Sequence, residues 1–321
     1  MKSKFLNFVC AIALSSYMMG CSDEASASNP GTAEQEESMS SADAGDLTNS
    51  SDSPAPSSSG AESQDNPGSA TAPEVLAPDA DGFYDMEDVY KLTPTTSKIA
   101  FVIRHSKREK SLGQESQLTP IGIQMAQTLG AKLASEESFY YASTDFIRTR
   151  ETCTNIAKGR GEENVEVVTW DGINGGYFLT VPSDTLDALV SSIGGNQTFI
   201  AQYAYGKTFT NPHYGELLTS YFYDFFERGN QFINEVIVPN MPSWKRVSIL
   251  VSHDMLVEPL IVYVSNRTID LKIYEGNHRW VNYLSGIAVI VDEAGAVTTL
   301  PVRGDSVGWM VPREEVDESV K

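Results

Sequence analysis

The amino-acid sequence predicts an α/β fold, with a mostly parallel central sheet that is flanked by helices and carries a helical insertion. Short apolar runs rich in β-branched residues alternate with segments of helical periodicity over residues 98–170. This alternation, with short links, is typical of a parallel sheet covered by helices. Further apolar runs of strand length come after residue 246, beyond a segment rich in aromatic residues. The order of these segments indicates one α/β domain with an insertion.

The first predicted strand is Lys98–Ile103, a run that is long enough for a buried strand and too short for a helix. A helix is expected to begin at Pro120, because Thr119 is a favourable N-cap and proline suits the first helical position. Apolar residues then recur at helical spacing, at Ile123, Ala126, Leu129 and Leu133. These two elements form the first strand–helix unit of the predicted sheet.

The other expected elements follow from the same two patterns. In chain order they are strand 139–142, helix 147–158, strand 165–170, the helical insertion 183–240, strand 247–252, helix 255–264, and strands 286–291 and 297–302. Pro259 would lie in or near the first turn of its helix, where a missing backbone N–H is tolerated. The last two strands would form a hairpin around Gly295.

The first 20 residues are predicted to be a secretory signal peptide, since Lys2 and Lys4 precede an apolar stretch. The sequence Met18-Met19-Gly20-Cys21 resembles the bacterial lipobox, in which cleavage precedes the cysteine and its sulfur carries lipid. This resemblance implies an exported protein that is anchored in a membrane through lipid on Cys21. Ser22 after the cysteine implies the outer membrane, with the periplasmic or the surface face left open.

Residues 21–78 are predicted to be a disordered tether. Residues 22–78 contain eleven acidic residues, no basic residue and no aromatic residue. Such a composition buries too little apolar surface to offset the conformational entropy that is lost on ordering. The predicted folded domain therefore spans residues 79–321.

The charge balance limits the partners of this protein. The chain of 321 residues has 43 acidic and 23 basic residues, and 79–321 alone has 32 acidic and 21 basic ones. An acidic surface repels nucleic-acid backbones, so no nucleic-acid partner is expected. Cys153 is the only cysteine in 79–321, which excludes an internal disulfide there.

Charged and titratable residues gather where the predicted strands end. Arg104-His105 follows the first strand, with Arg108 close behind, and His253-Asp254 follows the strand over 247–252. The second strand leads into Arg148, and the third ends at Asp171. Ligands of open parallel sheets bind outside the carboxyl ends of the strands, so these side chains are expected to share one site.

This set of residue types suits phosphoryl transfer. Guanidinium groups match phosphate oxygens and stay charged, a neutral imidazole can act as the nucleophile, and a carboxyl group can protonate the leaving oxygen. The sequence has no P-loop and no glycine-rich dinucleotide fingerprint, so no cofactor is expected. A metal site of His105, His253 and Asp254 is conceivable, but the neighbouring arginines would repel the cation, and no metal is expected.

Four segments in order carry a family resemblance. Arg104-His105-Ser106-Lys107-Arg108 resembles the Arg-His-Gly motif of the histidine phosphatase superfamily, which includes phosphoglycerate mutases, acid phosphatases and phytases. Leu118–Gly122, Ser143–Thr149 and Ser252-His253-Asp254 resemble the helix-opening, second-arginine and second-histidine segments of that superfamily. The resemblance implies a phosphoglycerate mutase-like fold, and the His-Asp pair brings the chain closer to the acid phosphatase branch.

The resemblance also implies a role for each candidate residue. His105 would be the phosphorylated nucleophile, and Arg104, Arg148 and His253 would bind the phosphate with Arg108 as a further contact. Asp254 is the preferred proton donor by resemblance to the acid phosphatases, whereas the mutases use an acid beyond the third strand, where Asp171 stands. We therefore expect a phosphatase that hydrolyses a small-molecule phosphomonoester through a phosphohistidine.

A second hypothesis is a surface lipoprotein that is weak or inactive as an enzyme and binds phosphorylated or other anionic ligands in the same pocket. It rests on two departures from the motif. Ser106 stands in place of the usual glycine, and Lys110 stands where a proline is expected. Turnover of phosphate esters discriminates between the two hypotheses.

Overall fold

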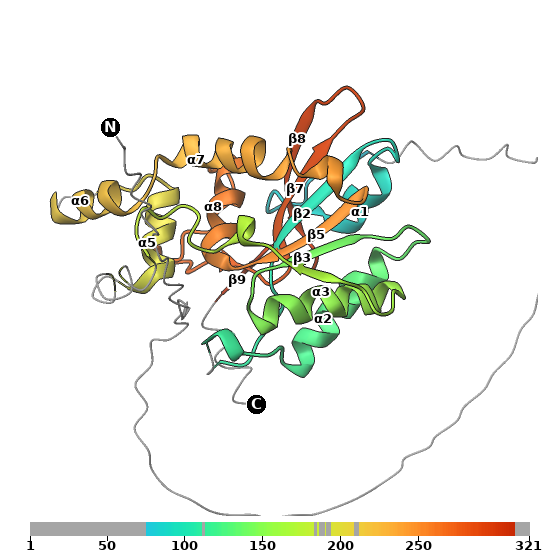
Figure 1. The fold of residues 1–321 in the computed structure, drawn as a ribbon. Helices are drawn as coiled ribbons and strands as arrows, with labels where there is room; N and C mark the ends of the chain where they lie inside the picture. Colours follow the sequence, from blue (N-terminus) through green and yellow to red (C-terminus); the bar gives the residue numbers. More distant parts are fainter. Residues whose placement is uncertain are drawn as a thin grey trace, which may run out of the picture. The chain divides into compact units, whose positions relative to one another are not determined.

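Seven strands form one mixed sheet in the order β1-β8-β7-β2-β5-β3-β4 (Figure 1). The structure is a computed structural model that describes residues 75–110, 113–182, 185, 190, 194–208 and 212–311. The strands of the sheet are β1 (Tyr84–Asp85), β2 (Lys98–Arg104), β3 (Tyr140–Ser143), β4 (Val167–Thr169), β5 (Val247–Ser252), β7 (Ser285–Val291) and β8 (Val297–Arg303). Strands β6 (Trp280–Val281) and β9 (Trp309–Met310) pair separately and antiparallel.

Most strand pairs of the sheet are parallel, as the sequence predicts. Strand β2 pairs in parallel with β5, β5 with β3, β3 with β4, and β1 with β8. The predicted hairpin of β7 and β8 is present, and β7 pairs antiparallel with β2. The predicted fold class is therefore confirmed, and β7 is the one strand of the sheet among the described residues that runs antiparallel to its neighbours.

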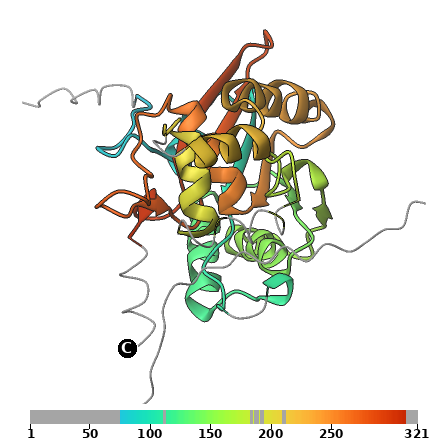
Figure 2. The same ribbon diagram turned by 90° about the vertical axis from the view of Figure 1, so that its left-hand side faces the viewer.

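Helices cover both faces of the sheet (Figures 1 and 2). They are α1 (Met86–Leu92), α2 (Pro120–Lys132), α3 (Ile147–Arg160), α5 (Gly195–Ala204), α6 (Pro212–Tyr221), α7 (Phe225–Gln231) and α8 (Asp254–Val264). Short segments add η1 (Gly113–Glu115), η2 (Asp171–Ile173), the π-helical η4 (Phe232–Ile237) and η5 (Met241–Ser243). Helices α5, α6 and α7 fall within the predicted insertion.

Strand β2 separates two hydrophobic clusters because its side chains alternate between the faces of the sheet. Ile99, Phe101 and Ile103 belong to the cluster with α1, α2 and α3. Ala100 and Val102 belong to the cluster with α5, α7 and α8. All five side chains are fully buried, which explains the continuous apolar run in the sequence.

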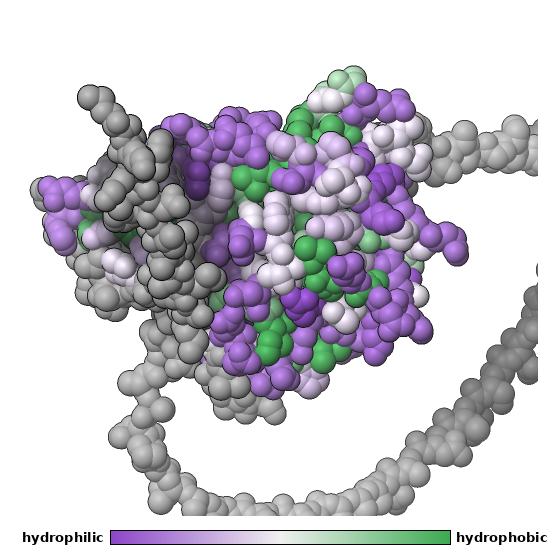
Figure 3. Space-filling model, viewed as in Figure 1, coloured by the Kyte–Doolittle hydropathy of each residue, from purple (hydrophilic) through white to green (hydrophobic). Residues whose placement is uncertain are grey.

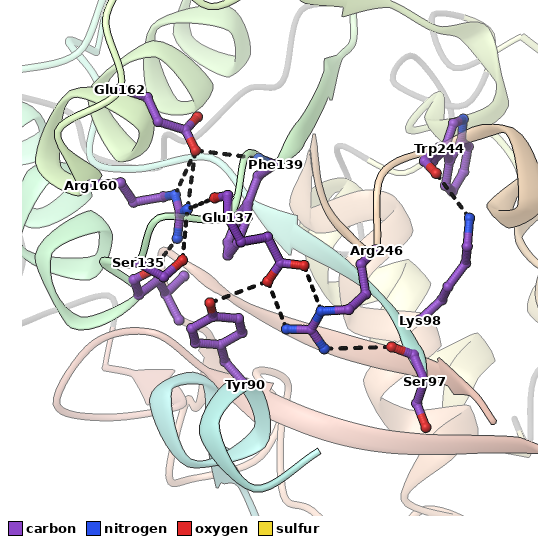
Figure 4. A network of polar contacts seen from close by, with 11 residues as sticks. Tyr90, Ser97, Lys98, Ser135, Glu137, Phe139, Arg160, Glu162, Trp244 and Arg246 are labelled. Atoms are coloured by element: carbon purple, nitrogen blue, oxygen red, sulfur yellow. Dashed lines mark hydrogen bonds and ion pairs between the residues drawn. The ribbon is translucent and has the colours of Figure 1, made fainter. Parts of the chain in front are cut away.

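The amino-terminal edge of the sheet is held by polar contacts (Figure 4). Arg246, just before β5, donates to both carboxylate oxygens of Glu137, which precedes β3. Lys98, at the start of β2, donates to the backbone carbonyls of Met241 and Trp244. These contacts fix three strand beginnings at the edge away from the strand ends where the candidate residues lie.

Some sequence predictions differ from the structure. Strand β1 and helix α1 were not expected, because a two-residue strand and a seven-residue helix are too short for a periodic pattern. Pro259 lies inside α8, beyond its first turn, so that prediction was wrong. Cys21, the predicted signal peptide and most of the predicted tether lie outside the described residues.

The surface of the described residues is mixed in character. On the face shown in Figure 3, hydrophobic residues form small separate groups among hydrophilic ones. No helix among the described residues has both the length and the apolar character that crossing a membrane requires.

Candidate active site

The two candidate histidines meet because β2 and β5 end side by side. Arg104 and Ser252 are partners in the parallel register, so His105 and His253 follow at the same edge. Their ring centroids are 5.6 Å apart, and the backbone N–H of His105 donates to the carbonyl of Ser252 at 3.0 Å. Both side chains are buried, with exposed fractions of 3% and 2%. The predicted convergence of these strand ends is thus present.

The ring of His105 is held in one tautomer. Its Nδ1 lies 2.8 Å from the backbone carbonyl oxygen of Ser106. Because a carbonyl only accepts hydrogen bonds, Nδ1 carries the proton, and Nε2 keeps its lone pair in the neutral ring. Burial lowers the pKa of His105 well below its ordinary value, and the charges of Arg148 and Arg104 lower it further. His105 is therefore a neutral imidazole with an unprotonated Nε2.

Ser106, which replaces the motif glycine, is fully accommodated. Its hydroxyl donates to the carbonyl of Gly122 at 2.7 Å, and its backbone N–H donates to Thr152 Oγ1 at 3.0 Å. Gly122 lies in the first turn of α2, where a Cβ atom would come within 1.9 Å of the Lys107 carbonyl oxygen. The serine thus joins the loop after β2 to the start of α2 without displacing the carbonyl that orients His105.

His253 lies in a directed chain of hydrogen bonds. Arg148 Nη2 donates to His253 Nδ1 at 3.3 Å, and His253 Nε2 donates to Thr144 Oγ1 at 2.9 Å. Thr144 then donates to Thr149, and Thr149 donates to the carbonyl of Phe146. Arg148 can only donate and the carbonyl can only accept, so every proton between them is assigned. His253 is the N-cap residue of α8, but its side chain makes no capping bond.

The electrostatic environment also keeps His253 neutral. Burial lowers the pKa of His253 well below its ordinary value, and the charge of Arg148 lowers it further, against an opposing contribution from Asp254. Arg104 and Arg108 lower it as well. Burial and the neighbouring arginines hold both rings neutral, and the positive charge of these arginines suits an anionic ligand.

The arginines come from different elements. Arg148 lies in the first turn of α3 and is 1% exposed. It donates to the Gly113 carbonyl at 2.7 Å, and its Cζ lies 4.4 Å from the centre of the Phe146 ring, on which it stacks. Arg104, at the end of β2, is also 1% exposed and donates to the Val281 carbonyl at 2.6 Å. Arg108 is buried and donates to the Glu109 carbonyl at 2.9 Å.

Asp254 holds Arg104 in place. Its Oδ2 lies 3.2 Å from Arg104 Nη2 and accepts from Trp280 Nε1 at 3.1 Å and from Gln197 at 3.2 Å. Burial would raise the pKa of Asp254, but Arg104, Trp280 and His253 outweigh it, so the pKa lies below its ordinary value. The Asp254 carboxylate is therefore ionised.

Asp171 is placed differently from Asp254. It is exposed at the start of η2, after β4. Its segment is joined to the same sheet edge, because Ser252 Oγ donates to the Ile173 carbonyl at 2.6 Å. The structure thus brings together His105, His253, Arg104, Arg148 and Asp254, and leaves Asp171 at the rim.

Several site residues were not expected from the sequence. Thr144 and Thr149 lie in the segment Ser143–Thr149, which resembles a family motif, so the sequence could have pointed to them. Trp280 and Gln197 reach Asp254 from segments far away in sequence, and Tyr283 lies under Arg104, with its ring centre 4.5 Å from the arginine Cζ. No sequence pattern marks these three residues. Within the described ranges, no three His, Cys, Asp or Glu side chains gather in a way that could hold a metal ion.

Comparison with known families gives one match. The profile of the Histidine phosphatase superfamily (branch 1) matches residues 100–275, more than half of the chain. The matched range includes His105, Arg148, His253 and Asp254. The closer resemblance to acid phosphatases rests on the His253-Asp254 pair and stays a prediction. A comparison with curated proteins finds no match.

A comparison with solved structures finds similarities at low sequence identity. A phosphoglycerate mutase from Bacillus anthracis str. Sterne is 20% identical, with a TM-score of 0.40 over 66% of this chain and 95% of that chain. A mycobacterial glucosyl-3-phosphoglycerate phosphatase is 14% identical, with a TM-score of 0.39 over 65% and 100%. A phosphoserine phosphatase mutant from Entamoeba histolytica is 15% identical, with a TM-score of 0.39 over 62% and 94%. Similarities of this degree carry no information about the substrate.

Proposed function

Because the chain belongs to the histidine phosphatase superfamily (branch 1), we propose that it hydrolyses phosphomonoesters through a phosphohistidine on His105. The observation that carries the proposal is the hydrogen bond from His105 Nδ1 to the Ser106 carbonyl, which leaves Nε2 unprotonated beside buried arginines. An unprotonated nitrogen next to fixed positive charge is what attack on a phosphoryl group requires.

In the first step, the lone pair of His105 Nε2 attacks phosphorus and the ester P–O bond breaks. Arg104, Arg148 and Arg108 offset the charge on the oxygens of the transferring group, and the neutral ring of His253 lies beside it. The alcohol oxygen leaves with the bonding electrons and takes a proton from a carboxyl group.

We propose Asp254 as that proton donor, because its ion pair with Arg104 places it beside the candidate phosphate site. Binding of the negatively charged phosphate near Asp254 would raise the pKa of its carboxyl group. In the second step, water attacks the phosphohistidine, the P–N bond breaks with its electrons returning to Nε2, and the carboxylate takes the proton of the water. Inorganic phosphate then leaves.

The test compares two histidine variants of the full-length protein on an aryl phosphate, with a chelator present. His105→Ala is expected to lose at least a thousandfold in kcat/KM and to form no acid-labile phosphoenzyme, since the nucleophile is gone. His213→Ala, at an exposed position in α6, is the matched control and should behave like the wild type. Equal turnover in His105→Ala and the wild type would refute the proposal.

We further propose that the protein is exported and held at a membrane, in bacteria the outer membrane, through lipid on Cys21. The support is the signal-like segment 1–20, the lipobox-like Met18–Cys21 and the acidic tether-like composition of 22–78. Several acyl chains together anchor a protein firmly, because each buried methylene contributes about 0.8 kcal/mol.

A further inference from the structure

A second pocket lies against the candidate phosphate site. Its volume is about 340 Å³, within the range of roughly 300–1,000 Å³ that is typical of small-molecule sites. The pocket opens between the start of α2, the segment before β7 and residues 305–311. Its wall is largely apolar and includes Ile121, Met125, Val307, Trp309 and Met310.

The wall of this pocket is continuous with the phosphate site. Tyr283 lines the pocket. Its ring centroid lies 6.0 Å from that of His105, and the ring packs against the Arg104 guanidinium. Met310 lines it as well, and its Sδ is 3.8 Å from Arg104 Nη1. Lys107, two residues after His105, also lines the pocket, so the loop after β2 joins the pocket to the phosphate site. A molecule whose phosphate lies on Arg104 therefore has this pocket beside it.

The chemistry of the wall favours an apolar group. Ile121 is 56% exposed and Val307 is 38% exposed, and they are two of only six large hydrophobic residues exposed to this degree in the described part of the chain. Lys107 and Asp305 have opposite charges, so the pocket offers no net charge to a second phosphate. The amide of Asn282 is already used, accepting from Tyr283 N and donating to the Val307 carbonyl. The Asn282 amide therefore has little capacity left for the hydroxyl groups of a sugar.

We propose that this pocket binds the alcohol part of the substrate, and that the substrate class is phosphomonoesters of apolar alcohols, either alkyl or aromatic. The proposal rests on the phosphatase function proposed above and adds its specificity. The apolar wall would remove the alkyl or aryl group from water while the arginines bind the phosphate, so both parts of the ester have complementary surroundings.

The test measures kcat/KM of the full-length protein for n-alkyl phosphates from ethyl to octyl, with glycerol phosphate as the polar comparison. We expect kcat/KM to rise about fourfold for each methylene that enters the pocket, equivalent to about 0.8 kcal/mol. Ile121→Ser and Val307→Ser should reduce this increment, and both positions are exposed enough for the variants to fold.

Val297→Ser is the matched control. Val297 has the same exposed fraction as Val307, 38%, but lies at the start of β8 in the hairpin that extends away from β9 (Figure 1). This variant should keep the wild-type increment. Equal kcat/KM for ethyl and octyl phosphates would overturn the pocket assignment. An equal reduction of the increment per methylene in Val297→Ser and Val307→Ser would overturn it as well. Neither result would affect the phosphatase function.

A separate measurement covers the case in which no phosphate ester is hydrolysed, a result that would refute the phosphatase function. Calorimetric titration with n-alkylphosphonates reports binding without cleavage of an ester. Affinity that rises with chain length in the wild type, and rises less in Val307→Ser, would support the pocket. Affinity that is independent of chain length, or the absence of binding, would overturn it.

Discussion

The side chains around His105 and His253 form a site that is prepared for an anion before any ligand binds. Each ring has one hydrogen-bond arrangement, fixed by a carbonyl or an arginine. Because burial and the arginines lower the pKa of both rings, both stay neutral at mildly acidic pH. Ser106 preserves this arrangement through its own hydrogen bond to Gly122, so the departure from the motif does not disturb the nucleophile.

Asp254→Asn is expected to affect substrates according to their leaving group. An alkoxide needs a proton when it leaves and a nitrophenolate does not, so kcat/KM should fall by about 10²–10⁴ for alkyl phosphates and much less for a nitrophenyl phosphate. Because the pKa of Asp254 is lowered, the wild-type kcat/KM for alkyl phosphates should also rise as the pH falls from 8 toward 5, and the variant should lose this rise.

Asp171→Asn is the comparison for this prediction, since Asp171 is exposed at the rim. Equal losses on both kinds of substrate in Asp254→Asn would indicate that Asp254 only positions Arg104. A loss confined to alkyl phosphates in Asp171→Asn would assign the proton to Asp171 instead.

Glu258 is a buried acid that the proposed chemistry does not use. It lies one turn after Asp254 in α8, is fully buried, and neither carboxyl oxygen has a hydrogen-bond partner among the described residues. Burial raises its pKa well above the ordinary value of 4.5, and the charge of Asp254 adds to the increase. The folded protein therefore holds a neutral acid where the unfolded chain ionises.

The pH dependence of stability follows from this difference. As the pH rises above 4.5, the unfolded chain loses the Glu258 proton first, so the free energy of unfolding falls by about 1.4 kcal/mol per pH unit until the raised pKa is reached. Glu258→Gln removes this loss, so its Tm should exceed that of the wild type by an amount that grows as the pH rises above 5. Glu235→Gln, at an exposed position, should show no such trend. A Tm difference that is constant with pH would contradict the prediction.

Helices and strands with strongly periodic sequences were predicted well, whereas the contacts between these elements were not. Thr119 caps α2 as expected, since its Oγ1 accepts from Gly122 N at 3.1 Å. By contrast, α2 and α3 approach so closely that Gly130 and Gly159 have no room for a side chain. A glycine inside a helical pattern does not reveal which backbone lies opposite, because that depends on the packing of a second helix.

Gly159→Ala tests this contact between α2 and α3. Its Cβ would come within 2.1 Å of the Gln127 carbonyl oxygen, so the helices must separate. Overpacking of this kind costs roughly 1–3 kcal/mol, and Tm should fall by roughly 2–4 °C per kcal/mol. Gly215→Ala in α6 is the matched control, because nothing lies within 4 Å of its Cβ position. The control should be unchanged or up to about 1 kcal/mol more stable; equal effects of the two substitutions would contradict the prediction.

At the scale of the whole protein, the acidic net charge limits which ligands suit the site. The arginines concentrate positive charge around the histidines, although the chain has a net charge of −20. A negative surface around a small cationic site disfavours polyanions and leaves a small anionic ester as the suitable ligand. This agrees with a substrate that has one phosphate group.

Cys21→Ser tests the proposed anchor in the full-length chain expressed in a bacterium. The wild type should incorporate labelled palmitate, whereas Cys21→Ser should incorporate none and keep an unchanged kcat/KM. Cys10→Ser, inside the predicted signal peptide, should behave like the wild type. Palmitate incorporation that survives in Cys21→Ser would refute the lipid anchor.

The sequence was sufficient to predict the α/β class, the order of the main strands along the chain and most of the residues that converge at their ends, whereas Asp171 was also expected there and is exposed. Those features follow from local patterns and from the rule that parallel strands end at one edge. The tertiary structure was needed to identify which side chains hold Asp254, that Ser106 reaches Gly122, and that an apolar pocket adjoins Tyr283. Such contacts join residues that are distant along the chain, and their distances depend on how whole elements pack rather than on any local pattern.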